Sequence, residues 1–282
     1  MPERVLGPRA YLNALTGILW REGLRFLKQR SRLIAALVRP TIWLLVFAVG
    51  FRGMLEVARV PPYDVQVGYE TYVIPGLLGM IQLFNGMQSS LSLVVDRELG
   101  SMRMLLAAPL PPGYLLFCKL LAGVAVSAIQ IVLFVLVAEA TVVDLPLLGL
   151  LRALPVLLLT GVMLGAIGLL LSATVRELEN FAGVMNFVIF PLFFLSSALY
   201  PLVQMRASSE LLYWISLFNP FTHAVEAIRF ALYGELAGQA LLVVAGCTVA
   251  GFALALRGYR ARTEGAQLTG RPPVLPRTTR GS

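Results

Sequence analysis

Long apolar runs separated by short polar segments dominate this chain of 282 residues. A helix needs roughly 20 apolar residues to cross a hydrocarbon layer about 30 Å thick. Runs of about this length lie at residues 36–57, 72–95, 114–138, 150–173, 181–200 and 239–256. The pattern therefore predicts an all-α integral membrane protein with six transmembrane helices.

A basic amphipathic segment precedes the first run. Between Tyr11 and Arg32, apolar residues recur at helical spacing and alternate with arginine and lysine. This pattern is typical of a helix that lies on the membrane surface. A simple positively charged flank is the alternative interpretation.

The segment between the fifth and sixth runs is unusually apolar for a loop. It spans residues 201–238 and includes "LLYWISLFNPFTHAVEAIRFALYG". Asn219-Pro220 divides it into pieces too short to cross a bilayer. We expect short re-entrant or interfacial helices here, packed against the rest of the protein.

A charged stretch between the second and third runs predicts another short helix, from Asp96 to Ala108. Acidic residues occupy its first turn, and Pro109, Pro111 and Pro112 end it. Its apolar face consists of Met102, Leu105 and Leu106. Such a helix can dock into a groove of a partner protein, or it can lie flat on the membrane.

The charge distribution gives an orientation. The chain is 58% hydrophobic and 13% charged, with a net charge of +8, and its lysines and arginines gather at the ends and beside the apolar runs. Juxtamembrane charge explains the basic balance, so we expect no nucleic-acid partner. With a cytoplasmic N-terminus, 18 of the 23 basic residues lie inside, which predicts that both termini are cytoplasmic. Arg39, at the entry of the first span, can extend to the interface.

Three regions follow from this topology. Residues 1–35 form a cytoplasmic N-terminus with the amphipathic interfacial helix, and residues 36–257 form the six-helix membrane domain. Residues 258–282 are polar towards the end and rich in proline and glycine, which predicts a disordered cytoplasmic tail.

Motifs for catalysis or nucleotide binding are missing from the sequence. It has no GxxxxGK[ST] loop and no HExxH, and its two cysteines, Cys118 and Cys247, lack metal-site spacing. Its one histidine, His223, lies in the apolar loop. The centres of the predicted spans are almost free of charge, so ion-driven transport lacks carriers. We predict no metal and no cofactor on this chain, and an energy source elsewhere.

The stretch "VVDRELGSMRMLLAAPLPPGYLLFCK" resembles the signature between spans two and three of type-2 ABC transporter permeases. "YETYVIPGLLGM" resembles the family's entry into span two, and "FVIFPLFFLSSALYPL" and "LFNPFTHAVEAIR" resemble its fifth span and the half-helices after it. The likeness is greatest to the branch with nodulation-factor and daunorubicin-type exporters. Many relatives carry an acidic residue where Arg103 stands.

The resemblance implies a transport subunit, not an enzyme, in the bacterial inner (plasma) membrane. Two copies of a separate ABC ATP-binding subunit would hold ATP and Mg, and a second permease copy would complete the pathway, as a homodimer or with a close relative. The cytoplasmic helix between spans two and three would be the coupling helix that contacts the ATPase. Its candidate residues are Asp96, Arg97, Glu98, Gly100, Ser101, Met102, Arg103, Leu105 and Leu106.

Polar residues within spans two and five are candidates for the transport pathway: Asn85, Gln88, Ser89, Asn186 and Ser196. They can equally be hydrogen-bonding contacts between helices. The function implied is export of a hydrophobic or amphipathic small molecule, a lipid or a lipid-linked saccharide, driven by ATP. The alternative is an intramembrane enzyme or a stand-alone membrane scaffold without an ATPase partner.

Overall fold

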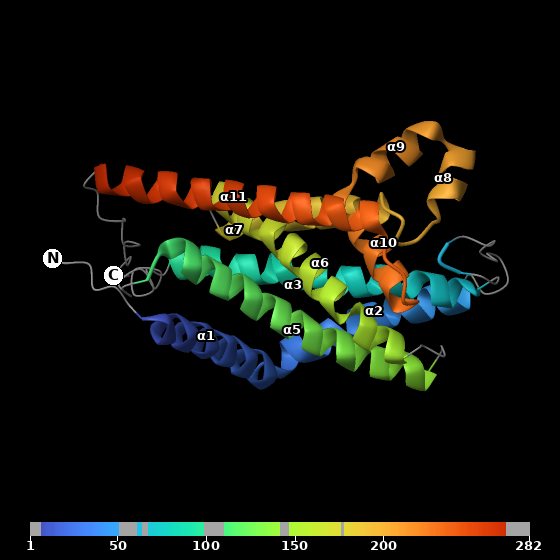
Figure 1. Cartoon of the computed structure of the whole chain (residues 1–282), viewed down its shortest axis with the longest axis horizontal. Coiled ribbons are helices and arrows are strands. Elements are labelled where there is room, and N and C mark those ends of the chain that lie inside the picture. The colour runs from blue at the N-terminus through green and yellow to red at the C-terminus, as the bar shows by residue number, and fades with distance from the viewer. Residues whose placement is uncertain are drawn as a thin grey trace, which may run out of the picture.

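A computed structural model describes residues 7–50, 61–63, 67–98, 110–141, 147–175 and 178–268. Within these ranges the chain is all-helical and contains no β-sheet. Six helices run lengthwise in one bundle (Figure 1): α2 (Arg30–Gly50), α3 (Tyr69–Glu98), α5 (Pro112–Thr141), α6 (Leu147–Thr174), α7 (Leu178–Phe194) and α11 (Gly238–Leu268). The all-helical prediction is confirmed.

Among the described residues, three helices are long and apolar enough to cross a membrane on their own, over Pro112–Ala140, Leu148–Thr174 and Gly238–Tyr259. Helices α2 and α7 carry shorter apolar stretches, Ile34–Phe47 and Glu179–Phe194. Helix α3 has 30 residues, which is about 45 Å at 1.5 Å per residue, although polar side chains interrupt it. The fold is therefore that of a multi-pass membrane protein.

Helix α3 is the centre of the bundle, and it packs most extensively against α6. Glycines let the two backbones approach closely. A Cβ atom added to Gly86 would lie 3.1 Å from the Cα atom of Gly165, and one added to Gly168 would lie 2.8 Å from the carbonyl oxygen of Gly86. Small residues serve this purpose in membranes, because lipid gives helices little hydrophobic drive to associate.

Helix α7 ends at Phe194, earlier than the predicted end of the fifth span at residue 200. The Asn219 side chain accounts for the stop. Its Nδ2 atom donates to the carbonyl oxygens of Leu192 at 2.8 Å and Leu195 at 2.6 Å, and its Oδ1 atom accepts from the backbone N–H of Phe221. One side chain thus satisfies carbonyls at the end of α7 and caps the next helix.

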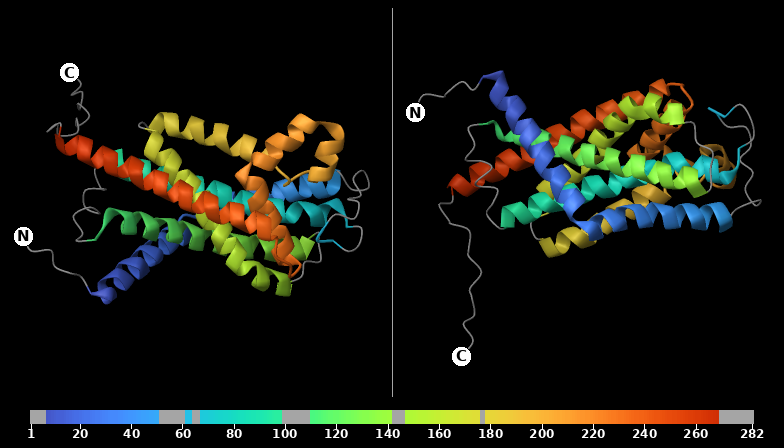
Figure 2. Two further views of the ribbon diagram at one scale, coloured as in Figure 1. Left: turned by 45° about the horizontal axis from the view of Figure 1, so that its top comes forward. Right: turned by 90° about the horizontal axis from the view of Figure 1, so that it is seen from below.

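Three short helices join α7 to α11, as the Asn219-Pro220 break predicts. They are α8 (Leu202–Ser208), α9 (Glu210–Phe218) and α10 (Pro220–Leu232). Helices α8 and α9 project from one end of the bundle, while α10 packs back onto α6, α3 and α11 (Figure 2). We call this end the α10 end.

Helix α1 (Pro8–Lys28) lies at the other end and meets α2 at an angle at Gln29 (Figure 2). Helix α11 also differs from expectation, because it continues to Leu268, into the segment predicted to be disordered. The residues after Leu256 include arginine, alanine, glutamate and glutamine, all good helix formers, and the first Pro comes only at residue 272.

Candidate functional site

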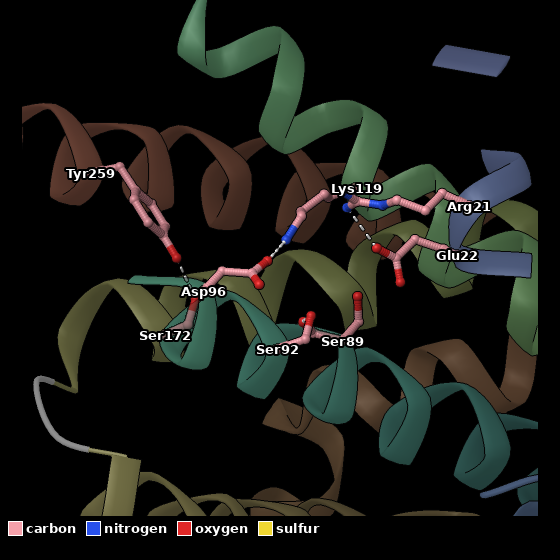
Figure 3. Close-up of polar contacts among 8 residues, drawn as sticks. All are labelled: Arg21, Glu22, Ser89, Ser92, Asp96, Lys119, Ser172 and Tyr259. Atoms are coloured by element: carbon pink, nitrogen blue, oxygen red, sulfur yellow. Dashed lines mark hydrogen bonds and ion pairs between the residues drawn. The ribbon is translucent and has the colours of Figure 1, made fainter. Parts of the chain in front are cut away.

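The last turn of α3 carries Asp96, and an ion pair ties it to α5. The Asp96 carboxylate accepts a hydrogen bond from the Nζ atom of Lys119 (Figure 3). Lys119 is only 5% exposed, so its ammonium depends on this carboxylate for compensation. Nearby, the hydroxyl groups of Ser172 on α6 and Tyr259 on α11 lie 2.8 Å apart. We call this end of the bundle the Asp96 end.

Helix α1 is attached to the Asp96 end through α5. The Tyr114 hydroxyl donates to the carbonyl oxygen of Tyr11 at 2.7 Å, and the two rings meet edge to face with centroids 4.9 Å apart. Phe26 is fully buried, whereas Trp20 and Leu27 point away from the bundle and are exposed. The predicted amphipathic helix is present. One of its faces packs against the protein, and another exposes apolar side chains.

Among the predicted coupling residues, the structure describes the side chain of Asp96 alone. It turns inwards to Lys119, so its carboxylate is already engaged within the chain. Arg97 and Glu98 complete α3, but their side chains lie outside the described residues. The rest of the segment does too: Gly100, Ser101, Met102, Arg103, Leu105 and Leu106. Their role stays a prediction.

A cavity of about 460 Å³ opens between α2, α3 and α5. Its apolar lining comes from Ala35, Ala36, Pro40, Met80, Ile81 and Phe84. Its polar lining comes from Gln29, Arg39, Asn85, Gln88 and Gln130. We call it the Arg39 cavity. Its size is within the range of small-molecule sites, and its mixed lining suits an amphipathic molecule.

The predicted pathway residues separate into two groups. Asn85 and Gln88 both line the Arg39 cavity, and Ser89 lies next to them on α3 against Gly123 of α5. Asn186 is exposed on α7. Ser196 is buried in the turn after α7, where its hydroxyl donates to the carbonyl oxygen of Phe193 at 2.6 Å.

The alternative interpretation of these polar residues holds in part. The Nδ2 atom of Asn85 donates to the carbonyl oxygen of Gly123 at 2.7 Å, which is a hydrogen bond between α3 and α5. Its side-chain oxygen is left for the cavity. Asn85 therefore both joins two helices and lines the cavity, while Ser196 makes only local contacts among the described residues.

Sequence reasoning found two of the five polar residues that line the cavity and missed Gln29, Arg39 and Gln130. Gln130 interrupts the apolar run of α5 and was a usable signal. We predicted that Arg39 can extend to the interface, and nothing in the sequence indicates a partner inside the bundle. Its Cζ atom lies 4.0 Å from the centre of the Phe84 ring, half-way along α3. Its neighbour across the bundle is a residue 45 positions away, which no local pattern reveals.

A second buried cation lies at the α10 end. Arg229 is 1% exposed, pairs with Glu226, and donates from Nη2 to the carbonyl oxygen of Ser197 at 2.9 Å. The same carbonyl accepts from the Tyr72 hydroxyl at 2.9 Å, and the Arg229 guanidinium lies over the Tyr72 ring. This network joins α10, α3 and the turn after α7.

Tyr63 borders this network from the segment before α3. Its ring meets that of Tyr233 edge to face, with centroids 5.0 Å apart. Tyr63 is 5% exposed, and burial raises the pKa of its phenol to about 12. The phenol is therefore neutral at physiological pH and contributes packing to this end of the bundle.

The described residues hold no group of three or more His, Cys, Asp or Glu side chains that could bind a metal. The Nε2 atom of His223 donates to the carbonyl oxygen of Leu217 at 2.9 Å, which is a structural contact inside the short-helix region. Cys118 and Cys247 are free thiols.

Comparison with known proteins agrees with this architecture. The transport permease ycf38 of Porphyra purpurea is 28% identical over 232 residues, covering 79% of this chain and 76% of that protein. The ycf38 permease of Pyropia yezoensis is 28% identical over 233 residues, covering 80% and 75%. Nodulation protein J of Rhizobium leguminosarum bv. viciae is 32% identical over 88 residues, covering 31% and 33%.

Residues 13–233 match the family described as ABC-2 type transporter. This match covers helices α2 to α10 and most of α1, and therefore both the Arg39 cavity and the Asp96 end. In such systems a separate subunit binds ATP, so the chain is a transport subunit and not an enzyme. The chain belongs to the ABC-2 type transporter family, as one of its membrane-spanning permeases.

Proposed function

We propose that this permease is the membrane subunit of an ATP-driven exporter. Its cargo is a hydrophobic or amphipathic small molecule, a lipid or a lipid-linked saccharide, taken from the cytoplasm or the inner leaflet. The Arg39 cavity carries the proposal, because it combines an apolar wall with polar side chains inside a membrane-spanning bundle. The partial likeness to nodulation protein J supports the export direction.

The topology of the proposed subunit has six transmembrane helices, with both termini in the cytoplasm of a bacterial inner membrane. The predominance of lysine and arginine on one side of the spans supports this orientation. The Asp96 end is then cytoplasmic and the α10 end faces outwards. Residues 1–35, 36–257 and 258–282 are the cytoplasmic N-terminus, the permease domain and the tail.

The proposed complex contains two permease copies and two ATP-binding subunits with ATP and Mg. The Trp43 ring on α2 contacts those of Phe193 and Phe194 at the end of α7. Both helices present exposed apolar side chains, among them Ile42 and Phe187. These side chains support a second copy at this face, with lipid around the remainder.

Coupling to the ATPase is assigned to the segment from Asp96 to Leu106, with α1 as a second contact. The Asp96–Lys119 ion pair and the Tyr114–Tyr11 hydrogen bond support this, since they connect both contacts to α5. A displacement of the segment or of α1 by the ATP-binding subunit is thereby transmitted to α3 and α5, which line the cavity. Rigid-body movement of these helices would switch access to the cavity.

The test is co-purification and transport with an ATP-binding subunit, sought first among the products of neighbouring genes. Glu98→Arg and Leu105→Asp should each abolish co-purification and ATP-dependent transport. Glu210→Arg, an exposed residue in α9 at the opposite end, is the matched control and should change neither. Intact co-purification and transport in both coupling variants would refute the assignment of the segment. Lack of any ATP-binding partner would refute the exporter.

A further inference from the structure

Among the described residues, Arg39 differs from the two buried cations, Lys119 and Arg229. Lys119 pairs with Asp96 and Arg229 pairs with Glu226. Arg39 takes part in none of the ion pairs of the described residues, and its contact is the Phe84 ring. Carboxylates neutralise the two buried cations, whereas Arg39 is exposed in the single chain and lines the cavity.

The position of Arg39 makes an unpaired charge costly. Phe84 lies 14 residues before the end of α3 at Glu98, roughly 21 Å along the helix axis. A guanidinium stacked on this ring is therefore well inside the span of α3. Ionisable residues at such depth are rare, usually have a partner, and mark pathways for charged cargo.

The geometry of the contact leaves the hydrogen-bond donors of Arg39 available. The guanidinium is planar, and its Cζ atom lies over the Phe84 ring, 4.0 Å from the ring centroid. Its N–H groups lie in that plane and point outwards, which is the arrangement that binds phosphate or carboxylate in a bidentate manner. The contact with the ring also stabilises the charged guanidinium at this position.

The remaining polar lining is neutral. The side chains of Gln29, Gln88 and Gln130 add amide donors and acceptors, and Asn85 offers its oxygen. The described lining contains no carboxylate that would repel an anion. The apolar wall continues from the cavity onto α2, where Ile42 is exposed.

We propose that the Arg39 cavity binds an amphiphile with an anionic oxygen headgroup, a phosphate or a carboxylate, and holds its apolar body along α2 and α3. The proposal rests on the proposed function, because it names the class of cargo. Arg39 binds the headgroup oxygens, Gln88 adds a hydrogen bond, and Met80, Ile81 and Phe84 contact the apolar part.

The test measures binding to the full chain alone, in dodecyl maltoside micelles, by native mass spectrometry. The probe is dodecyl phosphate. Dodecylphosphocholine has the same chain and a phosphate that choline neutralises, and inorganic phosphate has no chain. We expect at least tenfold tighter binding of dodecyl phosphate than of dodecylphosphocholine, which equals about 1.4 kcal/mol. Equimolar inorganic phosphate should not displace it, since the apolar wall adds affinity.

Arg39→Gln should abolish the preference for dodecyl phosphate, and Arg39→Lys should reduce it, because a point charge replaces the fork. Arg206→Gln, at an exposed arginine that stacks on Tyr213, is the matched control and should leave the preference unchanged. If Arg39→Gln does not yield a monodisperse protein, Gln88→Leu decides, and we expect at least threefold weaker binding.

An equal preference for dodecyl phosphate in the wild type and in Arg39→Gln would overturn the proposal. Where Arg39→Gln is not monodisperse, unchanged binding of dodecyl phosphate to Gln88→Leu would overturn it. Displacement by equimolar inorganic phosphate would overturn it as well, since the site would then hold a free anion. The assay needs no ATPase. A permease that couples to its ATPase and shows no anionic preference would refute this inference and leave the proposed function intact.

Discussion

Replacing Asp96 by Asn should destabilise the protein more than any comparable change at an exposed ion pair. The substitution keeps the shape of the side chain and removes its charge, so the Lys119 ammonium loses its counter-charge. The Lys119 side chain is 6% exposed, while that of Asp96 is 20% exposed. Breaking a buried ion pair in this way costs about 3–5 kcal/mol, and partial access to solvent at Asp96 favours the lower end.

A loss of about 3 kcal/mol corresponds to a decrease in Tm of roughly 6–12 °C for a chain of this size. The assay is a thermal melt in detergent with a thiol-reactive dye, because Cys118 is fully buried and reacts only on unfolding. Cys247→Ser serves as the common background, so that the signal comes from Cys118. The double variant Asp96→Asn with Lys119→Met removes both charges, and its loss should be clearly smaller than the sum of the two single losses.

The pair Arg21–Glu22 provides the control: the Arg21 Nη2 and Glu22 Oε1 atoms lie 2.9 Å apart, and the side chains are 53% and 17% exposed. The cation that loses its counter-charge is here in contact with solvent, whereas Lys119 is buried. Glu22→Gln should change stability by less than about 1 kcal/mol. The reasoning fails if the Tm of Asp96→Asn lies within 1 °C of that of the Cys247→Ser protein, because such a shift corresponds to no more than roughly 0.5 kcal/mol. It also fails if the losses in the double variant are additive.

Three further changes test other parts of the bundle in the same melt. Gly86→Val should lower the free energy of unfolding by about 3 kcal/mol, because the new side chain would meet the α6 backbone. Gly183→Val is the control and should lower it far less, because a Cβ atom there has open space. Equal losses in the two variants would contradict the close approach of α3 and α6. Arg229→Gln should lower the free energy of unfolding by about 3 kcal/mol, because the half-buried Glu226 carboxylate loses its counter-charge and the Ser197 carbonyl loses one of its two donors. A loss no larger than that of Arg206→Gln would refute it. The folded state keeps the Tyr63 phenol protonated until its pKa of about 12, whereas the unfolded chain ionises it near 10. Stability that is present below pH 10 should therefore be lost between pH 10 and 12, by about 2 kcal/mol, and identical pH profiles for the wild type and Tyr63→Phe would exclude this origin.

Hydrophobic periodicity predicted most of the fold, because length and apolarity are local properties. The predicted third and fourth spans differ from α5 and α6 by only a few residues at each end. The break at Asn219-Pro220 was also readable, since proline excludes a continuous helix. The early end of α7 was not, because it depends on a hydrogen bond from Asn219, more than 20 residues later.

Only those residues of the candidate site could be predicted that are recognisable one by one in the sequence. Asn85 and Gln88 stand out as polar positions in an apolar span, and both line the cavity. Arg39 looked like an ordinary flanking charge, because its partner Phe84 is brought to it by the packing of α2 on α3. Pairings of this kind depend on how helices rotate against each other, which a single sequence does not encode locally.

The carbonyl oxygen of Ser197 accepts hydrogen bonds from both Tyr72 and Arg229. Every residue type supplies this oxygen, so replacing the serine side chain with another small one leaves the junction in place. A scan limited to small residues would record position 197, which is fully buried, as tolerant, while its two donors would score as sensitive. Only a change of the main chain itself, such as an ester in place of the peptide bond that follows residue 197, would weaken the acceptor and reveal how much the junction contributes.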